Sequence, residues 1–369
     1  MEHEICIQCG AEVRPEEAYH VAEEAVCPSC AEADTVECSY CGERIWREND
    51  FGDSDTALCE ACYTNHYTRC NQCGRLISFS AAYYQDEDED EETPYCSACY
   101  HECGEAIHCY SYKPVPIFHG NAPMYMGVEL EVDDGGKDPV KAKKILSIFN
   151  QTGEFGYIKS DGSLDDGLEL VTHPCTLEAH MREVPWREAL EKFKSLGYYS
   201  HQSSTCGLHV HVNRTFFGAA QAEQDEKIGH VLYLFERFWQ ELLRFSRRTQ
   251  RQVAQWAARY GYKDTGREIM EHAKKAYQGR YTCVNLTNTD TIEFRIFRGT
   301  LKYNTLIATL QLVEKLCNVA VSLSEERLQA LSWSDIMLGI EPQRYPELVQ
   351  YLKELRLYIN APVSVECEV

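Results

Sequence analysis

The sequence predicts an α+β fold, in which an antiparallel sheet with helices follows three small cysteine-rich modules. Two observations lead to this prediction. Fourteen of the 19 cysteines lie before residue 111, at regular spacing. Four segments after that residue alternate apolar with polar side chains, as strands do, and amphipathic helical segments lie between them. With 369 residues, the chain is long enough for two or three domains.

The negative charge of the chain is concentrated in its first third. Residues 1–110 contain 25 acidic residues, five arginines and no lysine, and so carry −20 of the formal net charge of −22. Nucleic-acid-binding domains are basic, so we do not expect this region to bind nucleic acid. The acidic run 86–92 is interpreted as a solvated loop. The alternative role of this acidic region is docking of a basic protein partner.

The sequence also predicts where the protein is found. Its first ten residues lack the basic and then apolar pattern of a signal peptide. No apolar run approaches the roughly 18 residues that a membrane helix needs. We therefore expect a soluble cytoplasmic protein, in which reduced cysteines bind metal rather than form disulfides.

The first third contains a repeat. Cys6, Cys38 and Cys70 each begin a CxxC pair that is followed by glycine, and they are 32 residues apart. A second CxxC pair follows each of these after 17 residues, or after 22 in the third copy. The six pairs contain Cys6, Cys9, Cys27, Cys30, Cys38, Cys41, Cys59, Cys62, Cys70, Cys73, Cys96 and Cys99.

Two CxxC pairs supply the four thiolates of a closed tetrahedral zinc site. Residues 1–108 are therefore predicted to form three tandem zinc modules that resemble zinc ribbons or treble clefs of the LIM and RING-like kind, which implies protein binding. Sequential pairing within each module is expected, and ligation interleaved between neighbouring modules is the alternative. A fourth, incomplete site is a further alternative to a trailing helix with free thiols at His101, Cys103, His108 and Cys109.

The remainder is divided into a linker over residues 109–123, a catalytic domain over 124–335, and a C-terminal helical segment and tail over 336–369. Strands are expected in MGVELEVDD, GLELV, GLHVHVNR and TIEFRIF. Their polar faces carry Glu129, Glu131, Glu169, His209, His211, Glu293 and Arg295. Such a face is commonly only a wet outer surface. Carboxylates with occasional imidazole, however, also suit magnesium or manganese, and we expect a cleft that binds such a cation.

Helices are expected between and after these strands. The apolar spacing predicts them over residues 142–150, 185–196, 222–246, 303–322 and 345–357. A basic and aromatic stretch lies over residues 249–278, and Arg280 follows it. Its positive charge would offset the repulsion between an acidic cleft and a triphosphate, so Arg280 is a candidate for contact with that ligand.

Five segments after the modules together resemble the carboxylate–amine ligase (amidoligase) family, which shares its fold with glutamine synthetase and glutamate–cysteine ligase. In chain order they are YSYKP, GVELEV, KSDGSL followed by GLELVTHP, CGLHVHVNR, and VNLTNTDTIEFRIFRGTLKYNT, over roughly residues 110–315. The resemblance implies a glutamine synthetase-like antiparallel sheet, curved around a funnel that ATP enters from one end and the substrates from the other.

The resemblance also implies roles for individual residues. It implies that the magnesium ligands are Glu129, Glu131, Glu169, His209 and Glu293. Arg295 would contact the transferred phosphate and His211 would approach ATP. Asp161 and Ser163 would lie in a substrate-side loop, with Asp161 as the candidate base. Arg298 is a further candidate, although simple alternation places it opposite Arg295 unless the strand ends or bulges near Phe297.

These features predict an ATP- and magnesium-dependent ligase that forms an amide or peptide bond through an acyl phosphate. The expected cofactors are ATP, magnesium or manganese, and zinc, and the expected substrates are a carboxylate and an amine. The zinc modules would recruit a substrate or partner. Two alternatives remain: a non-catalytic zinc-binding adaptor with a degenerate ligase fold, and a kinase that phosphorylates a guanidino or carboxylate group. The loops between Arg214 and Arg280 match nothing that names the acid or the amine.

Overall fold

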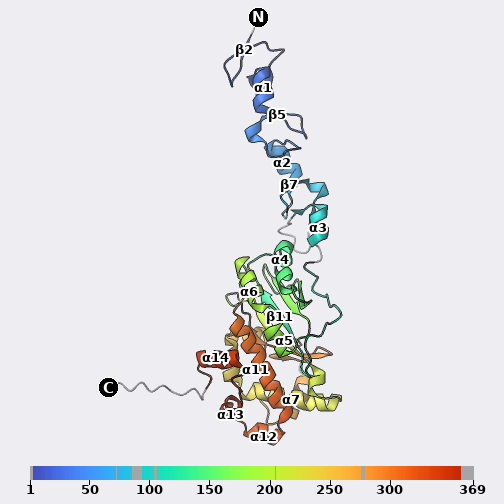
Figure 1. Cartoon of the computed structure of the whole chain (residues 1–369), viewed down its shortest axis with the longest axis vertical. Coiled ribbons are helices and arrows are strands. Elements are labelled where there is room, and N and C mark those ends of the chain that lie inside the picture. The colour runs from blue at the N-terminus through green and yellow to red at the C-terminus, as the bar shows by residue number, and fades with distance from the viewer. Residues whose placement is uncertain are drawn as a thin grey trace, which may run out of the picture. The chain divides into compact units, whose positions relative to one another are not determined.

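The computed structural model describes residues 3–71, 73–84, 94–103, 106–203, 205–275 and 279–358, with the side chains of residues 101–103 left out. The chain divides into two compact units, Met1–Glu105 and Ala106–Val369 (Figure 1). The acidic run 86–92 and the tail after residue 358 lie outside the described residues. Each unit is described by itself below.

The first unit consists of three modules, and in each of them one or two short hairpins precede one α-helix. The first module contains β1 (Glu4–Ile5), β2 (Glu12–Val13), β3 (Tyr19–Val21), β4 (Glu24–Val26) and α1 (Pro28–Asp34). The second contains β5 (Thr35–Glu37), β6 (Arg44–Trp46), the 3₁₀ helix η1 (Arg47–Asn49) and α2 (Glu60–His66). The third contains β7 (Tyr67–Arg69), β8 (Leu76–Ser78), η2 (Phe79–Ala81), β9 (Tyr83–Tyr84), β10 (Pro94–Tyr95) and α3 (Ser97–Cys103).

Cysteines fix where these elements begin. Cys27 and Cys59 are the N-cap residues of α1 and α2, so the second CxxC pair of each of these modules opens a helix. The buried apolar side chains are few, and the cluster of the second module is essentially Leu58 with three of its cysteines. Modules with so small a core need metal binding for most of their folding free energy.

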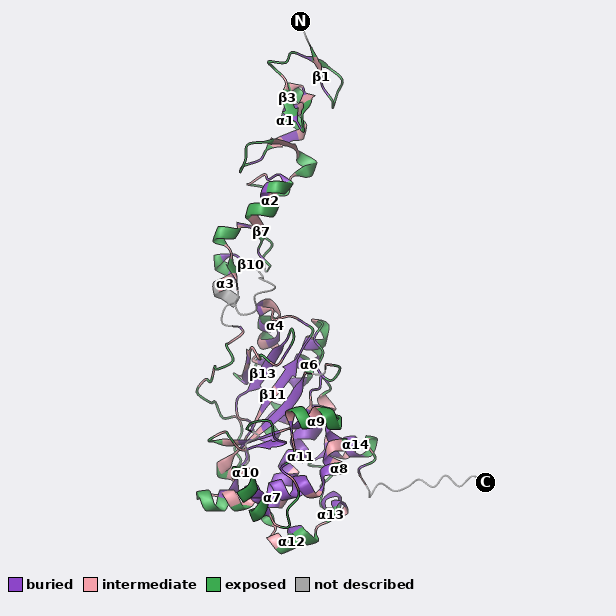
Figure 2. Ribbon diagram, turned by 180° about the vertical axis from the view of Figure 1, so that it is seen from behind, coloured by how far each residue is buried: buried purple, intermediate pink, exposed green. Residues whose placement is uncertain are grey.

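The second unit is built on a six-stranded antiparallel sheet with the strand order β12-β13-β11-β14-β16-β15. In chain order the strands are β11 (Met126–Val132), β12 (Gly156–Lys159), β13 (Leu168–Thr172), β14 (Gly207–Asn213), β15 (Val284–Asn285) and β16 (Thr291–Arg298). One face of the sheet is apolar, and Val128, Leu130, Val210 and Phe294 are fully buried there. The burial colouring shows these strands inside the unit (Figure 2). The other face carries the charged side chains that the alternation predicted.

Helices complete the core against the apolar face. They are α4 (Pro139–Phe149), α5 (Leu177–Arg182), α6 (Trp186–Ser195), α7 (Gln221–Arg237), α8 (Trp239–Ser246), α9 (Gln250–Trp256), α10 (Gly266–Lys275), α11 (Tyr303–Ser322), α12 (Glu325–Ala330), α13 (Trp333–Leu338) and α14 (Pro346–Glu354). Helix α11 packs against α7 and α14 and contacts β14 (Figure 1). The apolar strand residues and these helices form one hydrophobic cluster. The described residues thus form an α+β unit that follows three four-cysteine modules.

Several elements differ from their sequence-based expectation. The helix expected over residues 222–246 is two helices, since Phe238 leaves the helical conformation between α7 and α8. Strands β12 and β15 are short and add to the four strands that were expected. Helix α11 is long and apolar enough by composition to cross a membrane, whereas no such run was expected; 67% of its apolar window is buried in the unit, as in a core helix.

Residues 106–123, which include the predicted linker, lie along the second unit. The backbone of His108 pairs with β12. The N–H of His108 donates a hydrogen bond to the carbonyl of Ile158 at 2.9 Å, and the N–H of Ser160 donates one to the carbonyl of His108 at 2.9 Å. The N–H of His119 donates to the carbonyl of Pro174 at 3.0 Å. This segment therefore carries the YSYKP motif along the edge of the sheet.

Candidate active site and zinc modules

The cysteines of each module form one cluster. In each of three groups the four sulfur atoms lie within 4.8 Å of one another, and the groups are Cys6, Cys9, Cys27 and Cys30; Cys38, Cys41, Cys59 and Cys62; and Cys70, Cys73, Cys96 and Cys99. The structure therefore confirms sequential pairing and excludes the interleaved alternative.

The sulfur spacing has the size of a zinc site. Sγ–Sγ distances across the two CxxC pairs are 3.7 Å for Cys9 and Cys27 and 3.9 Å for Cys41 and Cys59. The edge of a tetrahedron with zinc–sulfur bonds of about 2.3 Å is about 3.8 Å. A disulfide would bring the sulfurs to about 2.05 Å. The clusters thus have the ligand set and spacing of structural zinc sites.

The backbone of the first CxxC pair holds this geometry. Gly10, Gly42 and Gly74 adopt φ values of +76°, +78° and +71°, which glycine reaches at little cost. The N–H of each glycine donates to the carbonyl of the first cysteine of its pair at 2.8 Å. Backbone N–H groups, that of Cys27 above all, lower the pKa of Cys6 to about 6. The local fold therefore favours the thiolate form of Cys6, whereas hydrogen bonds to Cys9 and Cys27 raise the pKa of Cys30 in the same cluster.

The described residues after the third module belong to none of the three four-cysteine clusters. Cys109 is exposed, and its sulfur lies 3.4 Å from the hydroxyl of Ser111. The ring of His108 stacks on Tyr112 with a centroid distance of 3.6 Å. The side chains of His101 and Cys103 lie outside the description.

The predicted acidic and imidazole side chains of the second unit come together on the polar face of the sheet. Glu131 pairs with Glu169 across β11 and β13, and Glu129 pairs with His209 across β11 and β14. His211 pairs with Glu293 across β14 and β16. Because residues two apart on a strand share a face, this register gathers all the side chains in one cluster.

The two histidines contact the carboxylates of this cluster directly. His209 Nδ1 lies 3.3 Å from Glu129 Oε2, 3.6 Å from Glu293 Oε1 and 3.8 Å from Glu131 Oε1. His211 Nε2 lies 3.3 Å from Glu129 Oε1. Burial would raise the pKa of Glu129, but the charges and hydrogen bonds of His211 and His209 outweigh it and hold that pKa well below the usual value.

Lys159 joins the cluster from β12. Its Nζ lies 2.9 Å from Glu169 Oε2 and 4.0 Å from Glu129 Oε1. Burial lowers the pKa of Lys159, and the neighbouring Glu169 and Glu129 charges reverse that effect, so the pKa is raised overall. Burial and the charge of Glu129 raise the pKa of Glu169 well above its usual value, and Lys159 offsets this in part. The raised pKa of Glu169 therefore reflects burial together with repulsion between neighbouring carboxylates.

Arginines lie at the β16 side of the cluster. Arg295 Nη1 donates to Glu293 Oε1. Leu208 pairs with Phe297 while Val210 pairs with Phe294, so β16 has an extra residue and bulges at this point. Without a bulge near Phe297, alternation would place Arg298 and Arg295 on opposite faces of the sheet. The bulge in β16 removes this obstacle, so the two arginines can lie on the same face.

Arg248, from the segment between α8 and α9, is a third arginine here. It is buried, and its Nε donates to the carbonyl of Phe297 at 3.2 Å. Burial lowers the pKa of Arg248 to about 10, and the charge of Glu131 opposes this while Arg295 and Arg298 add to it. The three guanidinium groups are thus close enough to act on one another.

Some donors of these arginines are not used within the protein. The Nε atoms of Arg295 and Arg298 are buried and have no hydrogen-bond partner in the described part of the chain. A side-chain carbon built at Gly207 would lie 2.6 Å from His209 Nε2, 2.7 Å from Arg248 Nη2 and 3.2 Å from Glu131 Oε2. Because Gly207 has no side chain, the space between Arg248 and the carboxylate cluster stays open.

Asn285 and Asn288 orient the last carboxylate. Asn285 Nδ2 donates to Glu293 Oε2 at 2.8 Å, and Asn288 Nδ2 donates to the same oxygen at 3.3 Å. Arg295 binds the other oxygen of Glu293. Both oxygens of this carboxylate are thereby held in fixed positions.

The remaining predicted residues lie apart from this cluster. Asp161 accepts hydrogen bonds from the N–H and hydroxyl of Ser163, at 2.6 and 2.5 Å, in the turn after β12. Arg280 contacts the hydroxyl of Tyr110, and its guanidinium carbon lies 5.7 Å from the centre of that ring. Lys159 Nζ lies 5.4 Å from the same ring. Among the described residues, Tyr110 and Lys159 thus connect Arg280 to the cluster.

The cluster contains two overlapping groups of metal-ligand atoms. Glu129, Glu169 and His209 form one, and Glu129, His211 and Glu293 form the other; within each, the atoms lie within 4.8 Å of one another. Carboxylate oxygens with an imidazole nitrogen are the donor set that magnesium and manganese accept. The repulsion between neighbouring carboxylates also favours a bound cation. The residues present therefore fit a divalent cation.

Sequence reasoning missed four residues of the cluster and its surroundings: Lys159, Arg248, Asn285 and Asn288. Lys159 begins the KSDGSL motif and Asn285 and Asn288 lie in VNLTNTD, so the motifs contained the signal. Arg248 lies only beside the basic stretch over residues 249–278, and nothing local distinguishes it from Arg247 or Arg251.

Comparison with known protein families finds one match in the second unit. Residues 146–317 match the family described as "Putative amidoligase enzyme", and this range contains β12, β13, β14 and β16 with their site residues. No curated protein matches the chain. Residues 146–317 therefore form a domain of this amidoligase family, preceded in the chain by three four-cysteine clusters of the zinc-binding type.

Proposed function

We propose that the chain is an ATP-dependent carboxylate–amine ligase with a glutamine synthetase-like fold. The carboxylate of one substrate attacks the terminal phosphorus of ATP, which gives an acyl phosphate and ADP. The amine of the second substrate then displaces phosphate, so an amide forms and one ATP becomes ADP and phosphate. One observation carries this proposal: four carboxylates and two imidazoles lie together on one face of the sheet, and three arginines lie beside them.

Magnesium or manganese would be held by Glu129, Glu169 and His209 and by Glu129, His211 and Glu293, with Glu131 beside them. The cation would neutralise the phosphate charge, which otherwise repels both the carboxylate cluster and the attacking substrate. Asn285, Asn288 and Arg295 fix Glu293 in the position that this role needs.

The arginines would supply positive charge to the transferred phosphate. Arg248 Nη2 borders the space beside Gly207, while the buried Nε atoms of Arg295 and Arg298 have no hydrogen-bond partner among the described residues. These three arginines would stabilise the negative charge that develops on the phosphate oxygens during transfer. The phosphate would then lie between the arginines and the cation ligands.

The substrate residues are assigned by the family resemblance. Asp161 and Ser163 would lie in the acceptor-side loop, and Asp161 would accept the proton from the attacking amine. Ser163 holds Asp161 in its turn. Arg280, which contacts Tyr110, would approach the outer part of ATP. The zinc modules would recruit a substrate or a basic protein partner in the cytoplasm.

The experiment is phosphate release by purified full-length protein with ATP, magnesium and pools of amino acids or peptides. Glu129→Gln and Glu293→Gln should lower the rate at least about 100-fold, because each removes a charge that the cation needs. Glu226→Gln is the control, since Glu226 is exposed and pairs with Lys227 at 2.9 Å. No phosphate release with any pool, together with no ATP binding, would reject the ligase.

Product mass distinguishes the two alternatives from ligation. Two substrates joined with loss of water indicate a ligase, whereas one substrate that gains a phosphate indicates a kinase. An adaptor would give neither product. For an adaptor, Glu129→Gln and Glu293→Gln would leave a cellular phenotype intact while Cys38→Ser abolished it.

A further inference from the structure

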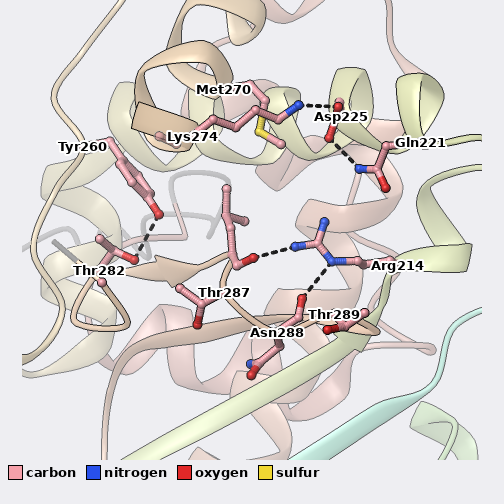
Figure 3. A pocket seen from close by; sticks show the side chains of 13 residues that line it. Arg214, Gln221, Asp225, Tyr260, Met270, Lys274, Thr282, Thr287, Asn288 and Thr289 are labelled. Carbon is pink, nitrogen blue, oxygen red and sulfur yellow. Dashed lines mark hydrogen bonds and ion pairs between the residues drawn. The ribbon is translucent and has the colours of Figure 1, made fainter. Parts of the chain in front are cut away.

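A cavity of about 450 Å³ lies between α7, α10 and the segment that joins β15 to β16. Figure 3 shows side chains from these elements around one space, with Gln221 and Asp225 on α7, Lys274 on α10, and Thr287 and Asn288 on the joining segment. Its volume suits a ligand of the size of an amino acid or short peptide end. None of the predicted site residues lines it.

The charged side chains that line the cavity are Arg214, Lys274 and Asp225. Two are cations and one is an anion, so the lining has a net charge of +1. Lys274 Nζ contacts Asp225 Oδ2, and Gln221 Nε2 donates to Asp225 Oδ1 at 2.9 Å. The carboxylate of Asp225 is therefore oriented from two sides, as Figure 3 shows.

Arg214 is held in place by the backbone and not by an acid. Its Nε donates to the carbonyl of Asn288 at 3.1 Å, and its Nη2 donates to the carbonyl of Leu286 at 2.7 Å. Burial lowers the pKa of Arg214, and the more distant charges of Asp225 and Asp290 offset this in part. A guanidinium fixed through neutral carbonyls keeps its positive charge available for an anionic ligand.

The cavity adjoins the carboxylate cluster through one residue. Asn288 lines the cavity, and its Nδ2 lies 3.3 Å from Glu293 Oε2. A ligand in the cavity would thus be separated from the cluster by the side chain of Asn288. The apolar side chains of Met270 and Leu286 also line the cavity and would contact the carbon skeleton of such a ligand.

We propose that this cavity binds a substrate of the ligase that carries an ammonium group and at least one carboxylate, in the form of a free amino acid. Arg214 and Lys274 bind the carboxylate, and Asp225 binds the ammonium group in exchange for its contact with Lys274. Because the lining is positive, ligands with net negative charge bind more tightly than neutral or cationic ones. The inference rests on the proposed ligase function, since it identifies the cavity as the substrate side of that site.

The cavity residues also explain why family resemblance does not name the substrate. Gln221, Asp225 and Lys274 lie in the stretch between Arg214 and Arg280, which matches none of the motifs. Arg214 itself and the lining residues 286–289 belong to motif segments, as the strands of the cluster do. A common reaction centre would thus be combined with a substrate pocket whose helical wall belongs to this chain.

The test is calorimetric titration of the full-length protein with each of the twenty amino acids, and with tripeptides that end in the same residues. The N-acetyl and the amide forms of every ligand that binds are titrated as well. The proposal expects binding that weakens at least about tenfold when either group is blocked, which corresponds to about 1.4 kcal/mol. The tripeptides lack an ammonium group on the residue that carries the carboxylate, so they should bind more weakly than the free amino acids. Binding by tripeptides but by no free amino acid would overturn the proposal.

Asp225→Asn and Lys274→Met are the cavity variants, and Glu226→Gln on the same helix is the matched control. Asp225→Asn should weaken binding at least about tenfold and remove the preference for a free ammonium group. Lys274→Met should remove the preference for anionic ligands. The control should bind as the parent does, because Glu226 is exposed and pairs only with its neighbour Lys227 among the described contacts.

The outcomes for the cavity and for the ligase are distinguishable. Binding that depends on Asp225 but occurs without any ATP-dependent phosphate release would support the cavity and reject the ligase. Phosphate release whose KM for the acid or amine is unchanged by Asp225→Asn would overturn the cavity assignment. So would the absence of binding by every amino acid and tripeptide, or binding of adenosine instead.

Discussion

Lys159 and Glu169 face each other across β12 and β13, and Lys159 Nζ lies 2.9 Å from Glu169 Oε2. Both side chains are largely buried, at 12% and 2% exposure. The same ammonium group lies 4.0 Å from Glu129, so one cation serves two carboxylates that also belong to the proposed metal site. Lys159 therefore neutralises part of the negative charge that a divalent cation would otherwise have to neutralise by itself.

The first prediction concerns this ion pair. Lys159→Met should lower the free energy of unfolding by about 3 kcal/mol without divalent cation, because it leaves a buried carboxylate uncompensated. Magnesium should reduce that loss, since it supplies positive charge to the same carboxylates. Urea denaturation with and without magnesium measures both values. Lys194→Met is the control, because its pair with Glu191 is exposed and should change stability by less than about 1 kcal/mol. An equal loss with and without magnesium would contradict the shared-charge explanation.

The second prediction tests the space beside Gly207. Gly207→Ala would place a carbon 2.6 Å from His209 Nε2 and 2.7 Å from Arg248 Nη2, so these side chains would have to move apart. We expect a loss of activity of at least about 100-fold, as a misplaced reacting group produces. Steady-state phosphate release measures it. Gly127→Ala on the adjacent strand is the control, since its new carbon would make an ordinary contact of 3.6 Å with His211. Equal activity of the two variants would show that the space has no catalytic role.

The third prediction concerns metal content. Mass spectrometry of the metals should give about three zinc ions per chain, because each four-cysteine cluster binds one. Cys38→Ser should lower this to about two and unfold its module, while Cys109→Ser should leave three, since Cys109 lies outside the clusters. Chelation should abolish the circular dichroism of the modules and leave that of the second unit. Zinc content near zero in protein purified without chelator would refute the zinc assignment.

The fourth prediction concerns pH and His180, which is fully buried. Trp186 Nε1 donates to His180 Nδ1 at 3.3 Å, and His180 Nε2 lies 3.0 Å from the carbonyl of Met126, so the neutral ring suits both contacts. Burial lowers the pKa of His180 from 6.5 to about 4. The unfolded chain therefore binds a proton before the folded one as pH falls.

The stability that neutral His180 provides is thus fully present above pH 6.5 and is lost between about pH 6.5 and 4, at up to about 1.4 kcal/mol per pH unit. His180→Gln removes this titration. The difference in the free energy of unfolding between the parent and His180→Gln should shrink from pH 7 to pH 5, as measured by urea denaturation. A difference that does not change with pH would mean that His180 is charged in the folded protein or titrates normally.

The zinc modules could be predicted almost completely because their signal is local. Two cysteines separated by two residues and followed by glycine form one half of a site through the backbone turn itself, as Gly42 shows with its N–H bond to Cys38. Only the choice between sequential and interleaved halves required coordinates. The short gap between Cys30 and Cys38 already favoured the sequential pairing that the sulfur positions confirm.

The carboxylate cluster could be predicted in part. Alternation placed Glu129, His209 and Glu293 on polar faces, because side chains on a strand alternate whatever its neighbours are. Strand β12 was missed since four residues are too short for a periodic signal, and Lys159 was missed with it. The bulge in β16 could not be derived either, since an extra residue in one strand is defined only against its partner.

The sequence by itself therefore determined the ligand types of both sites: twelve cysteines in repeated pairs, and carboxylates with imidazoles on the polar faces of strands. Only the tertiary structure decided which strands are neighbours, where Arg298 and Arg248 lie, and that a charged cavity adjoins Glu293 through Asn288. The physical reason is the range of the interactions. The face on which a residue lies is set within a few residues, whereas strand pairing joins residues more than 80 positions apart, as it does for His211 and Glu293.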